Sequence, residues 1–245
     1  MRFPSRHQSL SLLIKAGLPV GTVIDVGVHA GTPDLMELFP DKRHILIEPE
    51  AAHAAAIAEN YRGLDHQLHP TAASNVDGET RIISERKDSP SEITHSHVDP
   101  ASAGEIVRCQ RLDTLLASNP APKPFLLKID TDGHEREVLE GAAETLSHCA
   151  VAVVEIAPHE LTAIVGLLEQ AGFQLHDIVD LCYYHDTLSQ FDGVFVNRKL
   201  FDAGSLSPWQ TQAFRWADWK ALVSPADRVR QLGRHVARLR HKLFR

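Results

Sequence analysis

The chain has 245 residues, 43% hydrophobic and 23% charged, a composition typical of a globular protein with one large or two small domains. The formal net charge of −7 argues against general nucleic-acid binding, which requires a basic surface. Three scattered cysteines indicate reduced thiols in a cytoplasmic protein, with peripheral membrane contact left open. The sequence shows neither the apolar run of a membrane span nor the features of a signal peptide.

Apolar, β-branched runs alternate with helix-like segments over most of the chain. Residues 105–118 combine a short strand with a helix, whereas the polar stretch Glu85–Gly104 is expected to form a long loop. This alternation predicts an α/β fold, with a mainly parallel sheet, helices on both faces and the strand exits along one edge. Strands are expected at residues 22–27, 43–50, 150–157, 174–184 and 191–198. Three further strands are expected together with an adjoining loop or turn, within residues 65–74, 76–84 and 119–130. Helices are expected at 32–39, 51–61, 134–148 and 159–173.

The C-terminal segment has a different character. Ser224 and Pro225 form a helix start, and apolar residues then recur at three- and four-residue steps between basic ones, which indicates a basic amphipathic helix. We therefore expect a main domain over residues 1–200 and a helical extension over 201–245. The extension is expected either to pack on its own domain or on a second copy in a homodimer, or to contact anionic lipid or an acidic partner.

The first two expected strands each end at an acidic residue. Asp25 precedes a turn in which Gly27 and Gly31 let the backbone bend sharply and approach a ligand. This G-x-x-x-G spacing differs from the G-x-G-x-x-G of pyrophosphate binding, and Glu48 after the second strand can accept both hydroxyls of a ribose. These features favour a positively charged nucleoside without a phosphate chain, and S-adenosylmethionine fits. The alternative is a glycine turn with exposed acids at its rim.

Six segments of the chain recur in a known family: VIDVGVHAG, ILIEPE, TAASNVDGET, QRLDTLL, LLKIDTDGHEREVLEGA and VAVVEI. Together they resemble the FkbM family of class I S-adenosylmethionine-dependent methyltransferases over about residues 22–198, most specifically in the K-I-D-x-x-G-x-E core at 128–135. The resemblance implies a Rossmann-like fold whose seven-stranded sheet has an antiparallel last strand, and O-methylation of a sugar hydroxyl. The expected cofactor site comprises Asp25, Gly27, His29, Gly31, Glu48, Pro49, Ala72 and Ala73.

The chain departs from the family pattern at two places. Val28-His29 stands where the family has Ala-Asn, which affects the methionine end of the expected cofactor site. His134 stands where the family has a small residue, on the expected substrate side. The resemblance therefore supports the cofactor more firmly than it supports any particular acceptor.

Ionisable residues crowd the exit of the strand that ends near Ile129. Burying such charges costs free energy unless they are paired or used, so we expect them to line an active site beside the methyl group of the cofactor. Methyl transfer mainly requires alignment of the acceptor, and a base near its hydroxyl adds about 10²–10⁴-fold. The candidates for catalysis are Asp130, His134, Glu135 and Glu155, with His159 as a further base and Lys128 as the partner of a strand-exit acid.

Acids and histidines of this kind could also hold Mg²⁺, an alternative that stays open although no dedicated spacing of metal ligands supports it. The segment His95–Asp99 is interpreted as part of an exposed lid. Two other functions stay open: a nicotinamide-dependent oxidoreductase, whose G-x-G-x-x-G motif is absent, and a non-catalytic cofactor-binding scaffold that presents the basic tail to a partner. The acceptor is expected to be a saccharide or another small molecule, with no nucleic acid involved.

Overall fold

The computed structural model describes residues 4–86, 93–98, 100–101 and 103–201 of the chain. These residues belong to one compact unit, which extends over Arg2–Ser207. The helical extension expected over 201–245, with its basic amphipathic helix, lies outside the described residues apart from its first residue. Within the described ranges, no helix combines the length and the apolar character that crossing a bilayer requires.

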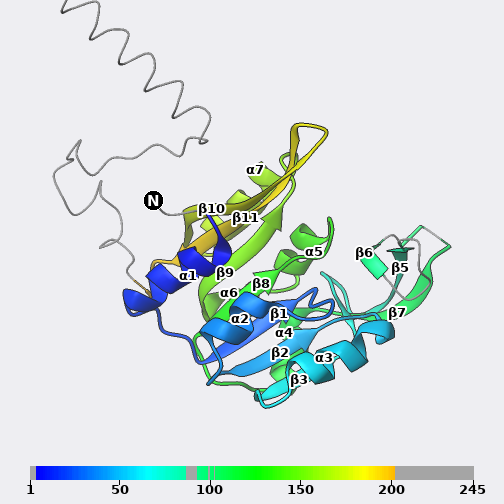
Figure 1. The fold of residues 1–245 in the computed structure, drawn as a ribbon, viewed down its shortest axis with the longest axis horizontal. Coiled ribbons are helices and arrows are strands. Elements are labelled where there is room, and N and C mark those ends of the chain that lie inside the picture. Colours follow the sequence, from blue (N-terminus) through cyan, green and yellow to red (C-terminus); the bar gives the residue numbers. More distant parts are fainter. Residues whose placement is uncertain (1–3, 87–92, 99, 102, 202–245) are drawn as a thin grey trace, which may run out of the picture. The chain divides into compact units, whose positions relative to one another are not determined.

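A seven-stranded sheet forms the centre of the fold, in the order β10-β11-β9-β8-β1-β2-β3 (Figure 1). β11 is antiparallel to both of its neighbours, and the remaining pairs are parallel. This arrangement confirms the predicted α/β class with one antiparallel strand. The strands span Thr22–Val26 (β1), Arg43–Ile47 (β2), His66–His69 (β3), Phe125–Ile129 (β8), Cys149–Ile156 (β9), Phe173–Tyr184 (β10) and Thr187–Asn197 (β11).

Helices cover both faces of this sheet, because its strands carry buried apolar side chains on both sides. One face packs against α1 (Arg6–Lys15), α2 (Pro33–Leu38) and α3 (Ala54–Asn60), the last preceded by the short helix η1 (Ala51–His53). The other face packs against α4 (Leu112–Ser118), α5 (Glu135–Glu140), α6 (Ala143–Ser147) and α7 (Leu161–Gln170). Side chains of β1 alternate between the faces: Val23 joins the α1–α2 core, and Ile24 joins the α4–α7 core.

A second, four-stranded sheet includes part of the segment that the sequence predicts as a long loop. It has the order β4-β7-β5-β6, and β6 pairs antiparallel with β5, so that Ile82 lies opposite Val98. The predicted loop over Glu85–Gly104 is therefore wrong for the residues that β5 and β6 occupy. Residues 93–98 have no apolar run, and their strand depends on backbone pairing with β5, which a local pattern does not reveal. The strands are Ala72–Ala73 (β4), Gly78–Arg86 (β5), Ile93–Val98 (β6) and Glu105–Gln110 (β7).

The helix predicted over 134–148 is divided into α5 and α6. The division falls at Gly141, where an added Cβ would lie 2.0 Å from the carbonyl oxygen of Ser74. The small sheet's approach to this turn thus requires glycine, and the helix ends there. α1 was not predicted. Ser5 is its N-cap, and the hydroxyl of Ser5 accepts a hydrogen bond from the amide of Gln8 at 3.3 Å.

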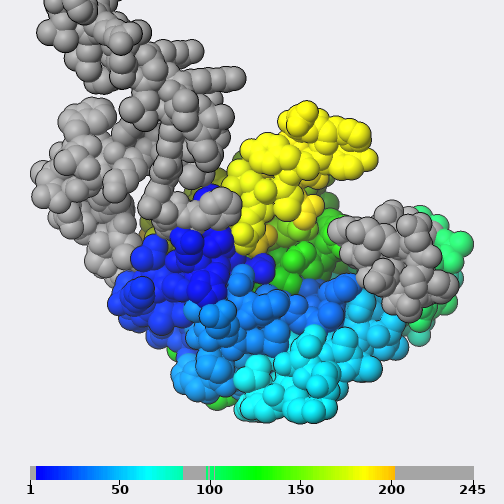
Figure 2. All heavy atoms as spheres, viewed as in Figure 1, coloured from blue at the N-terminus to red at the C-terminus, as the bar shows by residue number. Residues whose placement is uncertain are grey.

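Chain order places a ligand site at the exit of β1. From β1 the chain proceeds to β2 and β3 on one side of the sheet, and later to β8 and β9 on the other. In open α/β sheets, ligands bind outside the carboxyl ends of the strands at such a reversal of order. The β10–β11 hairpin, yellow in Figure 2, projects beyond the rest of the described surface.

Candidate active site

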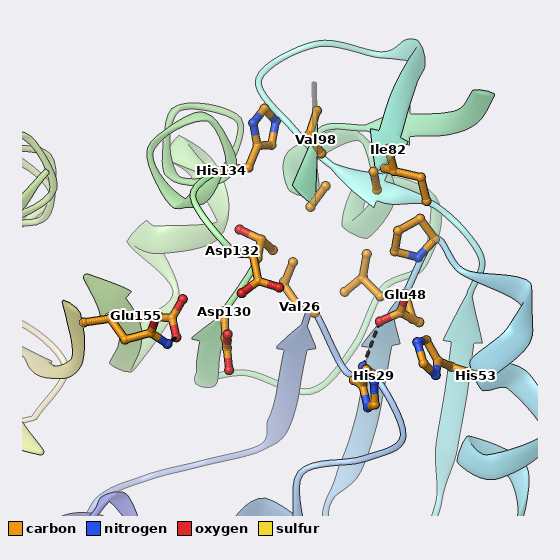
Figure 3. A pocket seen from close by; sticks show the side chains of 17 residues that line it. Val26, His29, Glu48, His53, Ile82, Val98, Asp130, Asp132, His134 and Glu155 are labelled. Atoms are coloured by element: carbon orange, nitrogen blue, oxygen red, sulfur yellow. Dashed lines mark hydrogen bonds between the residues drawn. The ribbon is translucent and has the colours of Figure 1, made fainter. Parts of the chain in front are cut away.

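A cavity of about 320 Å³ opens at the carboxyl ends of β1, β2, β8 and β9. This volume lies within the range of small-molecule sites, about 300–1,000 Å³. Figure 3 shows His29, Glu48 and His53 on one side of the cavity and Asp130, Asp132 and Glu155 on the other. Nine of the predicted site residues line it, namely Gly27, His29, Glu48, Pro49, Ala72, Ala73, Asp130, His134 and Glu155.

The turn after β1 depends on Gly27. Its φ is +75°, and an added Cβ would lie 1.7 Å from the carbonyl oxygen of Asp130. Only glycine therefore lets the exits of β1 and β8 approach this closely. Gly31 also has a positive φ, but it lies outside the lining, and an added Cβ there would be 3.3 Å from the Tyr61 ring. Gly31 thus packs beside the end of α3 and lies outside the cavity in which the sequence predicts a ligand contact for it.

Glu48 is held by two backbone amides. Its Oε2 accepts a hydrogen bond from the amide of His29 at 2.8 Å, and its Oε1 accepts one from the amide of Glu50 at 2.9 Å. Burial raises the pKa of Glu48, and these two hydrogen bonds oppose the rise. Each carboxylate oxygen has a further lone pair. Glu48 is therefore a pre-oriented acceptor for hydroxyl groups of a ligand in the cavity.

His29 and His53 lie beside Glu48, with their ring centroids 4.0 Å apart. His29 adopts the left-handed conformation at φ +51°, which histidine, asparagine and aspartate occupy more readily than most residues do. This explains how His29 can stand where the family pattern has asparagine. Burial, and after it the neighbouring His29, lowers the pKa of His53, which favours a neutral imidazole on this wall.

Asp25 does not line the cavity, contrary to the sequence prediction. Its side chain is fully buried, 3.2 Å from Nζ of Lys128, and it accepts a 3.4 Å hydrogen bond from the hydroxyl of Tyr61. The reason is strand alternation: Asp25 lies inside β1 between two residues of the α4–α7 core, so its side chain points to the opposite face. Burial disfavours the charged form of Lys128, but Asp25 and Asp130 outweigh it and raise the pKa of Lys128. The predicted pairing of Lys128 with a strand-exit acid is confirmed.

The other side of the cavity is acidic. Asp130 follows β8, is 38% exposed at its side chain, and lies 3.4 Å from Nζ of Lys128. Glu155 near the end of β9 accepts a hydrogen bond from the amide of Gln190, which reaches it from β11. Burial, and then the carboxyl groups of Asp130 and its neighbours, raises the pKa of Glu155 to about 9. Glu155 is thus protonated at neutral pH and can donate a hydrogen bond.

Glu135 has a structural position, contrary to the catalytic prediction. It is 4% exposed and outside the lining. Its Oε1 accepts hydrogen bonds from the amide and hydroxyl of Thr131 at 2.9 and 3.0 Å, and from the amide of Gly133 at 3.1 Å. The carboxylate thereby fixes the loop that carries Asp130 and Asp132.

His134 lines the cavity, but both of its ring nitrogens have neighbours. Nε2 lies 3.1 Å from the hydroxyl of Ser74, and Nδ1 lies 3.5 Å from a carboxylate oxygen of Glu137. Burial lowers the pKa of His134. Its use as a base would require the ring to leave these contacts. His159, the further candidate, is 79% exposed at its side chain and does not line the cavity.

Comparison with protein families identifies the chain. The model of the Methyltransferase FkbM domain matches residues 25–175. The chain belongs to the FkbM methyltransferase family. The strand order and the antiparallel β11 give this FkbM methyltransferase the class I, Rossmann-like fold that the family resemblance implies. No curated protein sequence matches the chain.

Solved structures that this FkbM methyltransferase resembles include three methyltransferases. Precorrin-6y C5,15-methyltransferase from Geobacter metallireducens GS-15 is 14% identical, with 77% of this chain and 83% of that chain covered and a TM-score of 0.42. An rRNA methylase from Streptococcus thermophilus is 11% identical, with coverages of 80% and 98% and a TM-score of 0.48. Magnesium protoporphyrin IX methyltransferase from Synechocystis PCC 6803, solved with bound SAM, is 10% identical, with coverages of 78% and 76% and a TM-score of 0.45. Likenesses of this degree say nothing about the acceptor of the FkbM methyltransferase.

Several lining residues of this FkbM methyltransferase were not predicted. Thr131 and Asp132 lie inside the K-I-D-x-x-G-x-E core, so their place beside Asp130 was a usable signal. Gln190 lies in the β10–β11 hairpin, whose sequence contains no motif that indicates a binding site. The remaining unpredicted residues come from strand ends, from η1 or from the small sheet, namely Val26, Ile47, His53, Ile82 and Val98. Among the described residues, no group of three or more histidine, cysteine, aspartate or glutamate side chains could hold a metal ion.

Proposed function

We propose that this FkbM methyltransferase transfers a methyl group from S-adenosylmethionine to a hydroxyl of a saccharide or glycosylated metabolite. The observation that carries the proposal is a single cavity with two chemically different sides. One side offers Glu48, fixed by two amides, and the other offers the carboxyl groups of Asp130, Asp132 and Glu155.

The Glu48 side fits the adenosine part of the cofactor. The carboxylate can accept hydrogen bonds from both ribose hydroxyls, because each oxygen keeps a free lone pair. Apolar side chains next to it suit an adenine ring, namely Ile47, Pro49, Ala72, Ala73, Ile82 and Val98. The absence of a side chain at Gly27 lets the exits of β1 and β8 approach each other closely at the cavity. When bound, the cofactor supplies an activated methyl group on a sulfonium.

The acidic side suits an acceptor rich in hydroxyl groups. Asp130 is the most suitable base, since it is partly exposed and its Lys128 partner is already in place. It would take the hydroxyl proton as the bond from the acceptor oxygen to the methyl carbon forms and the carbon–sulfur bond breaks. Protonated Glu155 and the amide of Gln190 would orient neighbouring oxygens of the acceptor.

A paired measurement on wild type, Glu48→Ala and Asp130→Asn tests this assignment. Isothermal titration with S-adenosylhomocysteine, with NAD as the negative control, should show binding that Glu48→Ala weakens by about 1–3 kcal/mol. Transfer of labelled methyl from S-adenosylmethionine to a panel of glycans should fall about 10²-fold or more in Asp130→Asn, with little change in binding.

Each failure in these assays has a distinct meaning. Unchanged affinity in Glu48→Ala would refute the ribose contact. Equal losses of affinity and turnover in Asp130→Asn would refute its role as the base. Cofactor binding without transfer to any glycan would favour the non-catalytic scaffold, and binding of NAD instead would favour the oxidoreductase.

A further inference from the structure

The β10–β11 hairpin carries more than half of the exposed large apolar side chains. Among the described residues, nine such side chains are exposed, and five of these belong to β10, namely Leu175, Ile178, Leu181, Tyr183 and Tyr184. Tyr183 and Tyr184 are the two most exposed of the nine, at 63% and 71%. Single exposed apolar side chains are normal, but several on one edge strand indicate a binding surface.

The same hairpin reaches the acidic side of the cavity. Gln190 of β11 lines the cavity, and its side-chain amide donates a hydrogen bond to Glu155. Cys182 of β10 lies opposite Gln190 in the hairpin, and the two tyrosines follow Cys182 directly. The surface of the hairpin is therefore continuous with the cavity, and the tyrosines lie farther from it along the strands.

Side-chain alternation along β11 shows which residues share the face of Gln190. Phe191 belongs to the α4–α7 core, and Leu188 packs against that core. Their neighbours Gln190 and Thr187 therefore point to the opposite face. Ser189 is the extra residue at the register shift in this part of the hairpin, which explains why three residues separate Gln190 from Thr187 on one face.

The pairing across the hairpin assigns the two tyrosines to different faces. Tyr184 lies opposite Thr187, and Tyr183 lies opposite Leu188. Opposite residues of an antiparallel pair share a face, so Tyr184 lies on the face of Gln190 and Tyr183 lies on the other. The ring of His185 meets the Tyr184 ring edge-on, with centroids 4.3 Å apart, and restricts its rotation. Tyr184 is thus an exposed, oriented ring on the face that leads to the cavity.

We propose that Tyr184 forms a stacking site for the sugar unit next to the one that is methylated, so that the acceptor is an oligosaccharide or a longer glycan. This inference rests on the proposed function and narrows its substrate class. A strand rise of about 3.4 Å per residue puts Tyr184 about 10 Å from Gln190 along the hairpin. An adjoining sugar unit can therefore reach the ring while the methylated unit contacts Gln190.

The chemistry of the hairpin favours a glycan over other occupants. The C–H bonds on one face of a sugar ring carry partial positive charge and suit the negative face of an aromatic ring, and the Tyr184 hydroxyl can donate or accept a hydrogen bond. Residues 173–197 contain no lysine or arginine, so the hairpin offers no cation of its own to the phosphates of a nucleic acid or an anionic lipid. Continuity with the cavity favours an extension of the acceptor over a separate protein partner.

Acceptors of increasing length test the inference on the full chain. Methyl transfer would be measured with methyl glycosides of glucose, mannose and rhamnose, each supplied as one, two and three linked units. In each series that is methylated, kcat/KM of wild type should rise about fivefold or more from one unit to three, because the added units contact Tyr184. Tyr184→Ala should reduce this gain by about threefold or more.

Tyr183→Ala is the matched control, because it removes the same side chain from the neighbouring exposed position on the other face. It should leave the gain with acceptor length unchanged. Equal kcat/KM for one unit and three units in wild type would overturn the inference and leave the proposed function standing, as would equal effects of Tyr184→Ala and Tyr183→Ala on the gain.

Two further results would count against the assignment in different ways. Gel filtration that shows dimers of wild type and monomers of Tyr184→Ala, with the gain unchanged, would overturn the inference in favour of contact with a second copy of the chain. Binding of S-adenosylhomocysteine without methylation of any saccharide would instead refute the proposed function.

Discussion

At the scale of single residues, the fate of an acid at a strand end depends on which way its side chain points. Asp25 and Glu48 occupy similar places in the sequence, each at the end of a parallel strand. Asp25 is the fourth residue of β1 and points into the α1–α3 face. There its carboxylate pairs with Lys128 and accepts a hydrogen bond from Tyr61. Glu48 follows the last residue of β2 and lies past the edge of the sheet, where two amides orient it. In the strand register Asp25 lies beside Leu46, so Glu48 lies two positions further along, past the edge of the sheet, where it lines the cavity.

The pKa of Glu155 gives a prediction at this scale. Burial and the nearby acids raise it from 4.5 to about 9, so the folded chain holds a proton that the unfolded chain releases. The contribution to stability is therefore fully present below about pH 4.5 and is lost as the pH rises through about 9. Relative to Glu155→Gln, the free energy of unfolding of wild type should fall by about 2 kcal/mol or more between pH 6 and pH 8.5.

Urea denaturation of both proteins across this pH range measures the difference. Comparison with an isosteric variant cancels the titration of all other groups, because wild type and Glu155→Gln share them. Parallel pH profiles would show that Glu155 is ionised in the folded protein at neutral pH. In that case its proposed role as a hydrogen-bond donor to the acceptor would be wrong.

At the scale of elements, the small sheet is linked to the Glu48 side of the cavity by a chain of hydrogen bonds. The hydroxyl of Ser84 on β5 donates to the carboxylate of Glu50. The amide of Glu50 in turn donates to Glu48 at 2.9 Å. The same sheet places Ile82 and Val98 on the cavity wall. The small sheet therefore shapes the site through both contact and the orientation of Glu48.

Ser84→Ala tests this link. It should raise the dissociation constant of S-adenosylhomocysteine about three- to tenfold, because Glu50 loses a hydrogen bond worth about 1 kcal/mol. The rate with saturating cofactor should change much less, since the acidic side is untouched. Thr80→Ala, where β5 pairs with Val107, is the control. Equal effects of the two variants on affinity would mean that β5 acts only as a scaffold.

At the scale of the whole molecule, all the residues assigned to the site belong to the compact unit Arg2–Ser207. Both α1 and Phe201 contribute side chains to the hydrophobic core between α1, α2 and the sheet. Phe201 is 8% exposed there. A chain cut before Phe201 would lose part of that core. A chain that ends at Ser207 keeps it whole.

The truncated chain ending at Ser207 should therefore fold and bind the cofactor product. We expect a single cooperative unfolding transition and an affinity for S-adenosylhomocysteine within about twofold of the full chain, because a domain with its own core folds independently. Circular dichroism and isothermal titration provide the two measurements. Loss of cooperative unfolding would show that residues 208–245 are part of the core of the unit.

The sequence by itself determined the class of fold and most residues on the Glu48 side of the cavity. Continuous apolar runs predicted the parallel strands, because a strand that is buried on both faces of the sheet carries apolar side chains at successive positions. The motifs from Gly27 to Glu155 located nine lining residues, because residues after consecutive parallel strands meet at one edge.

Only the tertiary structure decided the direction of each polar side chain and the pairing of weakly patterned segments. In the structure, Asp25, Gly31 and Glu135 lie outside the cavity lining, and Gln190 is part of it. It also formed β6 from residues without an apolar run. The physical reason is that hydrogen bonds and ion pairs form between groups far apart in the chain, such as Asp25 and Lys128. Their partners are fixed by how the strands align in space, and local periodicity carries no record of that alignment.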